Sequence, residues 1–146
     1  MNDKALITEA ITDLNRLRDF GMWEKMEGLF IDRPFVDDEA LTKEQASHRT
    51  VKQLISSWRR ELKNYFYATR HTVKKMTVGI MSRKEAEVTA ETAGQYFISD
   101  KGERYVLTVL GTYTYKMVKK SGIWKIGEIS FKLTEQFIRP VGFAAA

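Results

Sequence analysis

Few side chains in this chain could carry out acid–base chemistry, and a histidine is the clearest of them. The 146 residues include no cysteine, which excludes thiol catalysis, disulfides and cysteine-ligated zinc. A neutral imidazole is the side chain best matched to proton transfer near neutral pH. His71 opens a long stretch of alternating apolar and polar residues, whereas His48 is expected at the surface, early in a helix. On residue type alone a histidine on a strand is more often a packed or surface residue than a catalyst, so His71 is a candidate and no more.

A carboxylate at the end of the first expected helix is the second feature of this kind. Asp19 lies where the helix dipole slightly disfavours a negative charge. The ordinary interpretation is a solvated residue near a helix end. Its unfavourable position nevertheless suggests that another group holds it there.

Helical periodicity dominates the first 65 residues. Apolar residues three and four apart predict a helix over 3–20, with Asn2 or Asp3 at its start, and a second, shorter one over 22–30. Thr42 and Gln45 have the spacing of a capping box, which predicts a third helix ending near Tyr65.

The pattern changes to alternation from Tyr67 onward and stays so. Pro34 limits the short segment 31–39 to an edge strand or an extended connector. Strands are predicted over 67–82, 85–98 and, as a hairpin, 103–138. In the first of these the apolar parity switches, which predicts a bulge around Lys74 and Lys75.

The closing hairpin has an aromatic face. Ser121-Gly122 is a hairpin turn signal between two runs rich in β-branched and aromatic residues. Side chains of one parity point the same way along each run. They are Tyr105, Leu107, Val109, Tyr113, Tyr115 and Met117 in the first, and Ile129, Phe131, Leu133 and Phe137 in the second. Long paired strands coil, so this face is expected to be concave and to be filled by helices or by a ligand.

Helices followed by antiparallel strands predict an α+β fold, with helices packed on one face of the sheet. We expect one domain over 1–146, shaped as a cone in which a strongly curved, mostly antiparallel sheet wraps around the N-terminal helices. The hydrophobic content of 43% and charged content of 29% are typical of a soluble globular protein. No secretory pattern and no membrane-spanning run are recognisable, so the cytoplasm is the expected compartment.

Three pieces of the sequence together resemble the SnoaL-like branch of the nuclear transport factor 2-like superfamily. They are Arg18-Asp19-Phe20-Gly21-Met22-Trp23, Thr69-Arg70-His71-Thr72, and the hairpin pieces Gly111-Thr112-Tyr113-Thr114 and Gly122-Ile123-Trp124-Lys125-Ile126. The resemblance includes scytalone dehydratases and hexachlorocyclohexane dehydrochlorinases, and no single piece is specific. It implies that Asp19 and His71 form a catalytic dyad inside the cone. Met22 departs from the family, which often has a second acid at that position.

The implied chemistry is general base catalysis without a metal or an organic cofactor. The carboxylate would hold the imidazole in one tautomer and stabilise the imidazolium as it forms. An apolar cavity around such a base suits elimination, isomerisation or cyclisation of a small hydrophobic cyclic or aromatic molecule. The expected substrate-binding residues are Tyr67, Tyr96 and Tyr113 for hydrogen bonds and Trp58, Phe131 and Phe137 for the shape of the pocket.

Other functions remain open. Ketosteroid isomerases of the same superfamily have their base where Asp38 stands, but the matching oxyanion donors are absent from this sequence. The same fold also serves as a non-catalytic binding module for a small ligand or a protein. The net charge of +5 and the lysines near the sheet edge would attract nucleic acid, but exposed aromatic residues between them are not expected, so neither nucleic acid nor a membrane is an expected partner.

The sequence also favours a homo-oligomer, either a dimer or a trimer. The outer face of the sheet is apolar enough for an interface; its residues are Val106, Leu110, Thr112, Thr114, Val118 and Ile126. The apolar tail 137–146 is expected to cover the mouth of the pocket or a neighbouring subunit.

Overall fold

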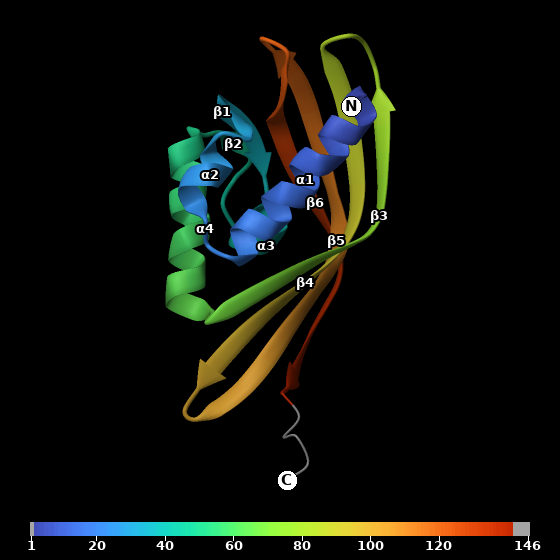
Figure 1. Ribbon diagram of the computed structural model, residues 1–146. Coiled ribbons are helices and arrows are strands. Elements are labelled where there is room, and N and C mark those ends of the chain that lie inside the picture. The colour runs from blue at the N-terminus through green and yellow to red at the C-terminus, as the bar shows by residue number, and fades with distance from the viewer. Residues whose placement is uncertain (1, 142–146) are drawn as a thin grey trace.

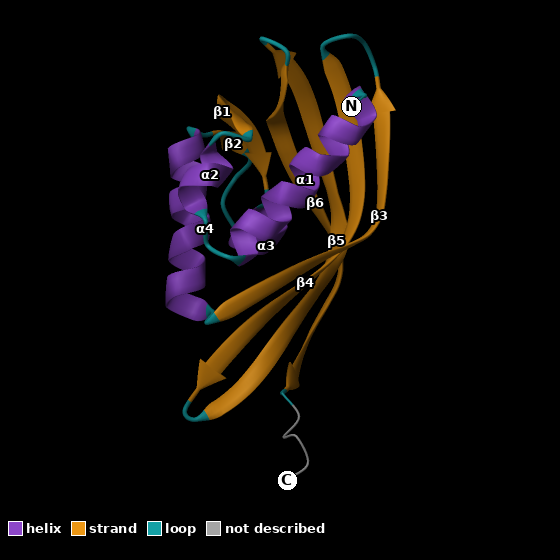
Figure 2. Ribbon diagram, viewed as in Figure 1, coloured by secondary structure: helices purple, strands orange, loops and turns teal. Residues whose placement is uncertain are grey.

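The computed structural model describes residues 2–141, in which helices gather on one side of a single six-stranded sheet (Figures 1 and 2). The helices are α1 (Asp3–Asp19), α2 (Trp23–Glu27), α3 (Glu39–Thr42) and α4 (Val51–Tyr65). The strands are β1 (Phe30–Asp37), β2 (Ser47–His48), β3 (Ala68–Ile80), β4 (Glu85–Asp100), β5 (Glu103–Lys120) and β6 (Ile123–Pro140). The predicted α+β class is confirmed. That the sheet closes into a cone stays a prediction.

Side-chain caps fix where the two long helices begin. The Asn2 side chain accepts a hydrogen bond from the Ala5 N–H at 2.8 Å, as expected for the start of α1. In α4 the Thr50 hydroxyl accepts from the Gln53 N–H at 3.1 Å, and the Gln53 side chain accepts from the Thr50 N–H at 2.9 Å. This reciprocal pair is a complete capping box, so α4 begins at Val51.

The prediction of a longer third helix, starting from Thr42, is wrong. Thr42 is the last residue of the single-turn helix α3, and the chain then forms the two-residue strand β2. His48 therefore lies on a strand rather than in a helix, and it is exposed as expected. The reason is that Ser47 and His48 pair with β1, so this segment satisfies its backbone through the sheet.

The strands are ordered β2-β1-β6-β5-β4-β3. The four long strands form the predicted antiparallel meander. The segment 31–39 was expected to be an edge strand or an extended connector, but β1 lies between β2 and β6 and is parallel to β6. Pro34 is tolerated there because the β1–β6 register is interrupted between Phe30 and Phe35, where no regular ladder bond is required of it.

Three β-bulges set which face each strand residue occupies. The expected bulge lies between Val73 and Lys75. In β6 two further bulges leave one residue each without a partner in β5. Gly127 is skipped because Lys116 pairs with Glu128 and Met117 with Ile126. Thr134 is skipped because Leu110 pairs with Glu135 and Gly111 with Leu133. One extra residue reverses the alternation of faces. Ile126, expected on the outer face, is therefore fully buried.

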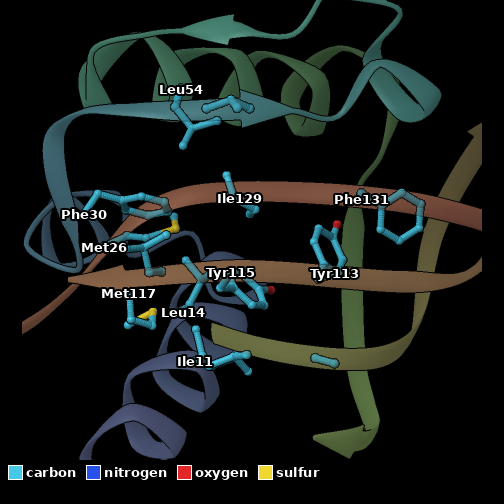
Figure 3. Packing of buried hydrophobic residues seen from close by; sticks show 14 of the residues in the cluster. Ile11, Leu14, Met26, Phe30, Leu54, Tyr113, Tyr115, Met117, Ile129 and Phe131 are labelled. Atoms are coloured by element: carbon cyan, nitrogen blue, oxygen red, sulfur yellow. The ribbon is translucent and has the colours of Figure 1, made fainter. Parts of the chain in front are cut away.

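The core fills the space between the helices and the sheet. Figure 3 shows Ile11 and Leu14 of α1 close to Tyr115 and Met117 of β5, and all four are at most 2% exposed. Burying such side chains is the main favourable term in folding. This packing fixes α1 against the sheet. Between residues 2 and 141, no helix is both long and apolar enough to cross a membrane.

Candidate active site

Asp19 and His71 meet where the last residue of α1 lies against the start of β3. The Asp19 Oδ1 and His71 Nδ1 atoms are 2.6 Å apart. The His71 backbone N–H donates to Asp19 Oδ2 at 2.7 Å, and the Thr69 hydroxyl donates to Oδ1 at 3.0 Å. Three donors on one strand thus hold one carboxylate, which explains why a negative charge is tolerated at the unfavourable end of a helix.

The partners of the His71 ring define its tautomer. A carboxylate can only accept hydrogen bonds, so Nδ1 carries the proton that points to Asp19. In the neutral ring Nε2 is then an acceptor, and the Tyr96 hydroxyl, 3.0 Å away, donates to it. The result is a chain of three groups, Asp19, His71 and Tyr96, with a basic nitrogen directed to the phenol.

The surroundings favour the neutral form of this imidazole. Burial lowers the pKa of His71, the positive charge of Arg18 lowers it further, and Asp19 opposes both effects. The His71 side chain is only 1% exposed, while that of Asp19 is 17% exposed. A neutral imidazole, with a lone pair on Nε2 that can accept a proton, is the form that a general base requires.

A glycine makes room for this arrangement. Gly94 lies opposite His71 in the β3–β4 ladder. A Cβ atom there would be 2.9 Å from the Tyr96 ring and 3.5 Å from His71 Cδ2. The absence of a side chain at Gly94 therefore allows the phenol and the imidazole to approach each other.

Tyr96 connects the dyad to an internal cavity of about 260 Å³. Seven apolar side chains line it; they are Val36, Leu41, Trp58, Phe66, Leu107, Val109 and Ile129. Polar groups also face it, from Arg18, Asp38, Thr42, Glu61, Tyr65, Tyr96, Tyr113 and Gln136. His71 and Asp19 are not among the lining residues and border a separate, more open hollow beside α1. The imidazole thus reaches the internal cavity through the Tyr96 hydroxyl.

Two acidic residues also face the cavity. Asp38 is 6% exposed, and its Oδ1 lies 3.4 Å from Arg49 Nη1 and accepts a hydrogen bond from Thr42 at 3.1 Å. It is thus committed to an ion pair, which does not favour the ketosteroid isomerase alternative. Glu61 is half-buried, and burial raises the pKa of its carboxyl group, with Arg18 opposing the rise.

Three of the six expected substrate-binding residues line the cavity and three do not. Trp58, Tyr96 and Tyr113 line the cavity. Tyr67, which is 51% exposed, lies outside it with its ring 6.0 Å from that of Phe97.

The two expected phenylalanines also lie outside the lining. Phe131 packs behind Tyr113, with ring centroids 4.6 Å apart. Phe137 pairs with Thr108, and the bulge at Thr134 turns it to the face opposite that of Gln136, which occupies the lining position instead. Simple alternation could not reveal this, because a bulge leaves only a weak trace in sequence.

Arg18 was not singled out from the sequence, although its position on the apolar stripe of α1 could have indicated it. It continues the stripe of Ile7, Ile11 and Leu14 along α1, and all of these are buried. An arginine on the buried stripe of a helix is unusual enough to be noticed.

Within residues 2–141, no three His, Asp or Glu side chains gather in a way that could hold a metal ion.

An α+β domain with a buried imidazole–carboxylate pair beside an internal cavity is a class found among small-molecule enzymes and binding proteins. The SnoaL-like domain family matches residues 1–130, and the chain belongs to that family, within the nuclear transport factor 2-like superfamily. No curated protein sequence matches this chain significantly.

Solved structures share the fold at low sequence identity. The Kfla4162 protein from Kribbella flavida superposes with a TM-score of 0.82 at 18% identity, over 92% of this chain and 93% of that one. A candidate scytalone dehydratase from Novosphingobium aromaticivorans gives 0.77 at 17% identity, over 97% and 95%. The hexachlorocyclohexane dehydrochlorinase LinA-type3 from Novosphingobium barchaimii gives 0.78 at 10% identity, over 98% and 91%. Similarity at this level establishes the fold alone.

Proposed function

We propose that this protein is a cofactor-independent lyase that removes H–X from a small cyclic or aromatic molecule in the internal cavity. The observation that carries the proposal is the position of His71, with Nδ1 held by Asp19 at 2.6 Å and Nε2 bonded at 3.0 Å to a phenol of the cavity wall. Structural relatives described as dehydratases and dehydrochlorinases support the reaction class.

In the proposed reaction Tyr96 relays the proton. The substrate C–H proton passes to the Tyr96 oxygen as the phenolic proton passes to His71 Nε2. The electron pair of the C–H bond forms the new double bond, and the bond to the leaving group breaks. The imidazolium is stabilised by Asp19. When X is a hydroxyl group the proton returns through Tyr96 to the departing oxygen and gives water; when X is a halogen the group leaves as halide ion and the imidazolium releases its proton to solvent. Burial raises the pKa of Tyr96, with Arg18 opposing the rise, so the phenol stays neutral between turnovers.

The test is an elimination assay on single-ring compounds that have an acidic C–H next to a carbon bearing a hydroxyl group or a halogen. Formation of the conjugated product is followed by absorbance. His71→Gln is expected to lower kcat by roughly 10²–10⁴-fold, the usual contribution of a general base. His48→Gln is the matched control, because His48 is exposed and does not line the cavity; its Nδ1 contacts the Arg33 carbonyl oxygen at 3.3 Å and its ring packs edge-on against Phe35. Turnover that survives His71→Gln would refute the proposal.

A non-catalytic binding module is the alternative, and two observations favour it. The basic nitrogen of His71 is already occupied by Tyr96, and the ring itself does not line the cavity. A purely structural network would have the same contacts. In that case compounds would bind to wild-type protein and to His71→Gln with equal affinity, and neither would produce turnover.

A further inference from the structure

Arg18 is a buried cation that the proposed proton transfer does not use. Its side chain enters the core from α1, and the residue is 9% exposed. A guanidinium is always protonated in proteins, so burial cannot neutralise it. Taking such a charge out of water is expensive unless another group compensates it.

The protein supplies only part of that compensation. Arg18 Nη1 donates to the Tyr113 hydroxyl at 3.4 Å, and the guanidinium carbon lies 4.0 Å from the centre of the Trp58 ring. Among residues 2–141, no carboxylate oxygen lies within 4.0 Å of its nitrogens. The adjacent Asp19 is engaged by Thr69 and His71. A stacked guanidinium that faces a cavity with most of its five donors unused is thus preorganised to bind an anion.

The other acids of the cavity do not serve as this counter-ion. Asp38 is paired with Arg49. Glu61 also faces the cavity; burial raises the pKa of its carboxyl group and the positive charge of Arg18 opposes the rise, but Glu61 makes no close ion pair with Arg18. Glu61 is a competitor for Arg18 at a distance beyond 4.0 Å.

From this geometry we propose that the cavity binds a single-ring oxyanion, such as an aromatic carboxylate, with Arg18 as its charge partner. If the protein is the lyase proposed above, this oxyanion is its substrate. The binding site itself does not depend on that function; only the description of the bound molecule as a substrate does. A carboxylate accepts two parallel N–H bonds from one guanidinium. The volume of 260 Å³ equals that of roughly nine waters at about 30 Å³ each, which admits one substituted ring against Leu107, Val109 and Ile129.

Calorimetric titration with benzoate and benzamide tests the charge requirement, since the two probes have the same ring and nearly the same size. Benzoate is expected to bind wild-type protein at least tenfold more tightly than benzamide. Arg18→Gln removes this preference. Arg18→Lys keeps the charge but loses the planar fork, so benzoate binding weakens several-fold while benzamide binding is unchanged.

Glu61→Gln tests whether Glu61 competes with the ligand for Arg18, and thermal melting checks that the variants fold. Removing the competing acid at Glu61 tightens benzoate binding several-fold and leaves benzamide binding unchanged. The melting temperature of Arg18→Gln is not expected to fall, because the substitution relieves the burial of a charge; should it unfold, Arg18→Lys carries the test. Equal affinity for both probes, a preference that persists in Arg18→Gln, or no binding of either probe at millimolar concentration overturns the inference.

The outcome is independent of catalysis. Benzoate has no leaving group, so its binding does not require turnover. His71→Gln should retain benzoate affinity within about twofold, because His71 does not line the cavity. If wild-type protein prefers benzoate but eliminates none of the test compounds, the lyase alone is refuted. Elimination by wild-type protein without a preference for benzoate refutes the oxyanion site alone.

Discussion

Replacing Asp19 by Asn changes one oxygen into a nitrogen and is expected to move a proton on His71. In the wild-type protein Asp19 accepts three hydrogen bonds, two from His71 and one from Thr69. An amide can accept at only one of its two positions. The backbone N–H of His71 cannot become an acceptor, whereas the imidazole and the Thr69 hydroxyl can. The amide oxygen therefore faces the backbone, its NH₂ group donates to Nδ1, and the ring proton moves to Nε2.

The size of the effect follows from these three bonds. Hydrogen bonds to charged groups contribute about 1 kcal/mol more than neutral ones, so the substitution lowers the free energy of unfolding by up to about 3 kcal/mol. For a chain of this size each kcal/mol shifts Tm by roughly 2–4 °C, which gives a decrease of up to about 12 °C. Because Nε2 then carries a proton and can no longer accept one, kcat falls by roughly 10³–10⁴-fold.

The tautomer is measured by ¹⁵N NMR of the imidazole rings and requires no substrate. A His48→Gln background leaves His71 as the one histidine signal. Asp13→Asn is the matched control, since Asp13 lies in the same helix and makes an exposed pair with Arg16, which is worth about 0.5 kcal/mol or less. A wild-type ring protonated at Nε2, or an unchanged tautomer in Asp19→Asn, would refute the reasoning.

Three further substitutions test other parts of the structure. Tyr96→Phe removes the relay and is expected to lower kcat at least 10²-fold; it also lowers Tm, because the buried Nε2 of His71 loses its hydrogen-bond donor. Activity near the wild-type level would mean that His71 contacts the substrate directly. Gly111→Ala is expected to cost more than 2 kcal/mol in a urea titration, because its Cβ would lie 2.5 Å from the Lys132 carbonyl oxygen, whereas at Gly79 the nearest atom would be 3.8 Å away and alanine is tolerated. The unfolded chain binds a proton at His71 near pH 6.5 while the folded chain, with its lowered pKa, does not, so wild-type stability falls as pH drops below about 6.5. His71→Gln should remove that part of the pH dependence, and an identical pH profile would contradict it.

Local patterns predicted the elements more successfully than their boundaries. The stripe of α1 and the alternation of β3–β6 follow directly from which side chains must be buried. The start of α4 did not, because Thr42–Gln45 and Thr50–Gln53 have the same capping chemistry and the same spacing. The pairing of Ser47 and His48 with β1 decides which of the two capping boxes starts the helix, and that contact is not local in sequence.

The candidate site likewise has features that the sequence could indicate and features that depend on contacts between distant segments. Asp19 and His71 are 52 residues apart, and only a family resemblance could suggest that they meet. The bulge at Thr134 and its effect on Phe137 depend on the register of β5 against β6. Arg18, in contrast, could have been noticed from sequence alone as a charge on the apolar stripe of α1.

The three bonds that Asp19 accepts from β3 also fasten the end of α1 to the sheet. In a descendant that no longer turned over any compound, selection for folding alone would still retain this pair. Arg18 has no such protection, since a buried unpaired charge strains the fold that contains it. Among related chains, drift at Arg18 beside an intact Asp19–His71 pair would therefore mark the lineages in which the pocket has lost its ligand.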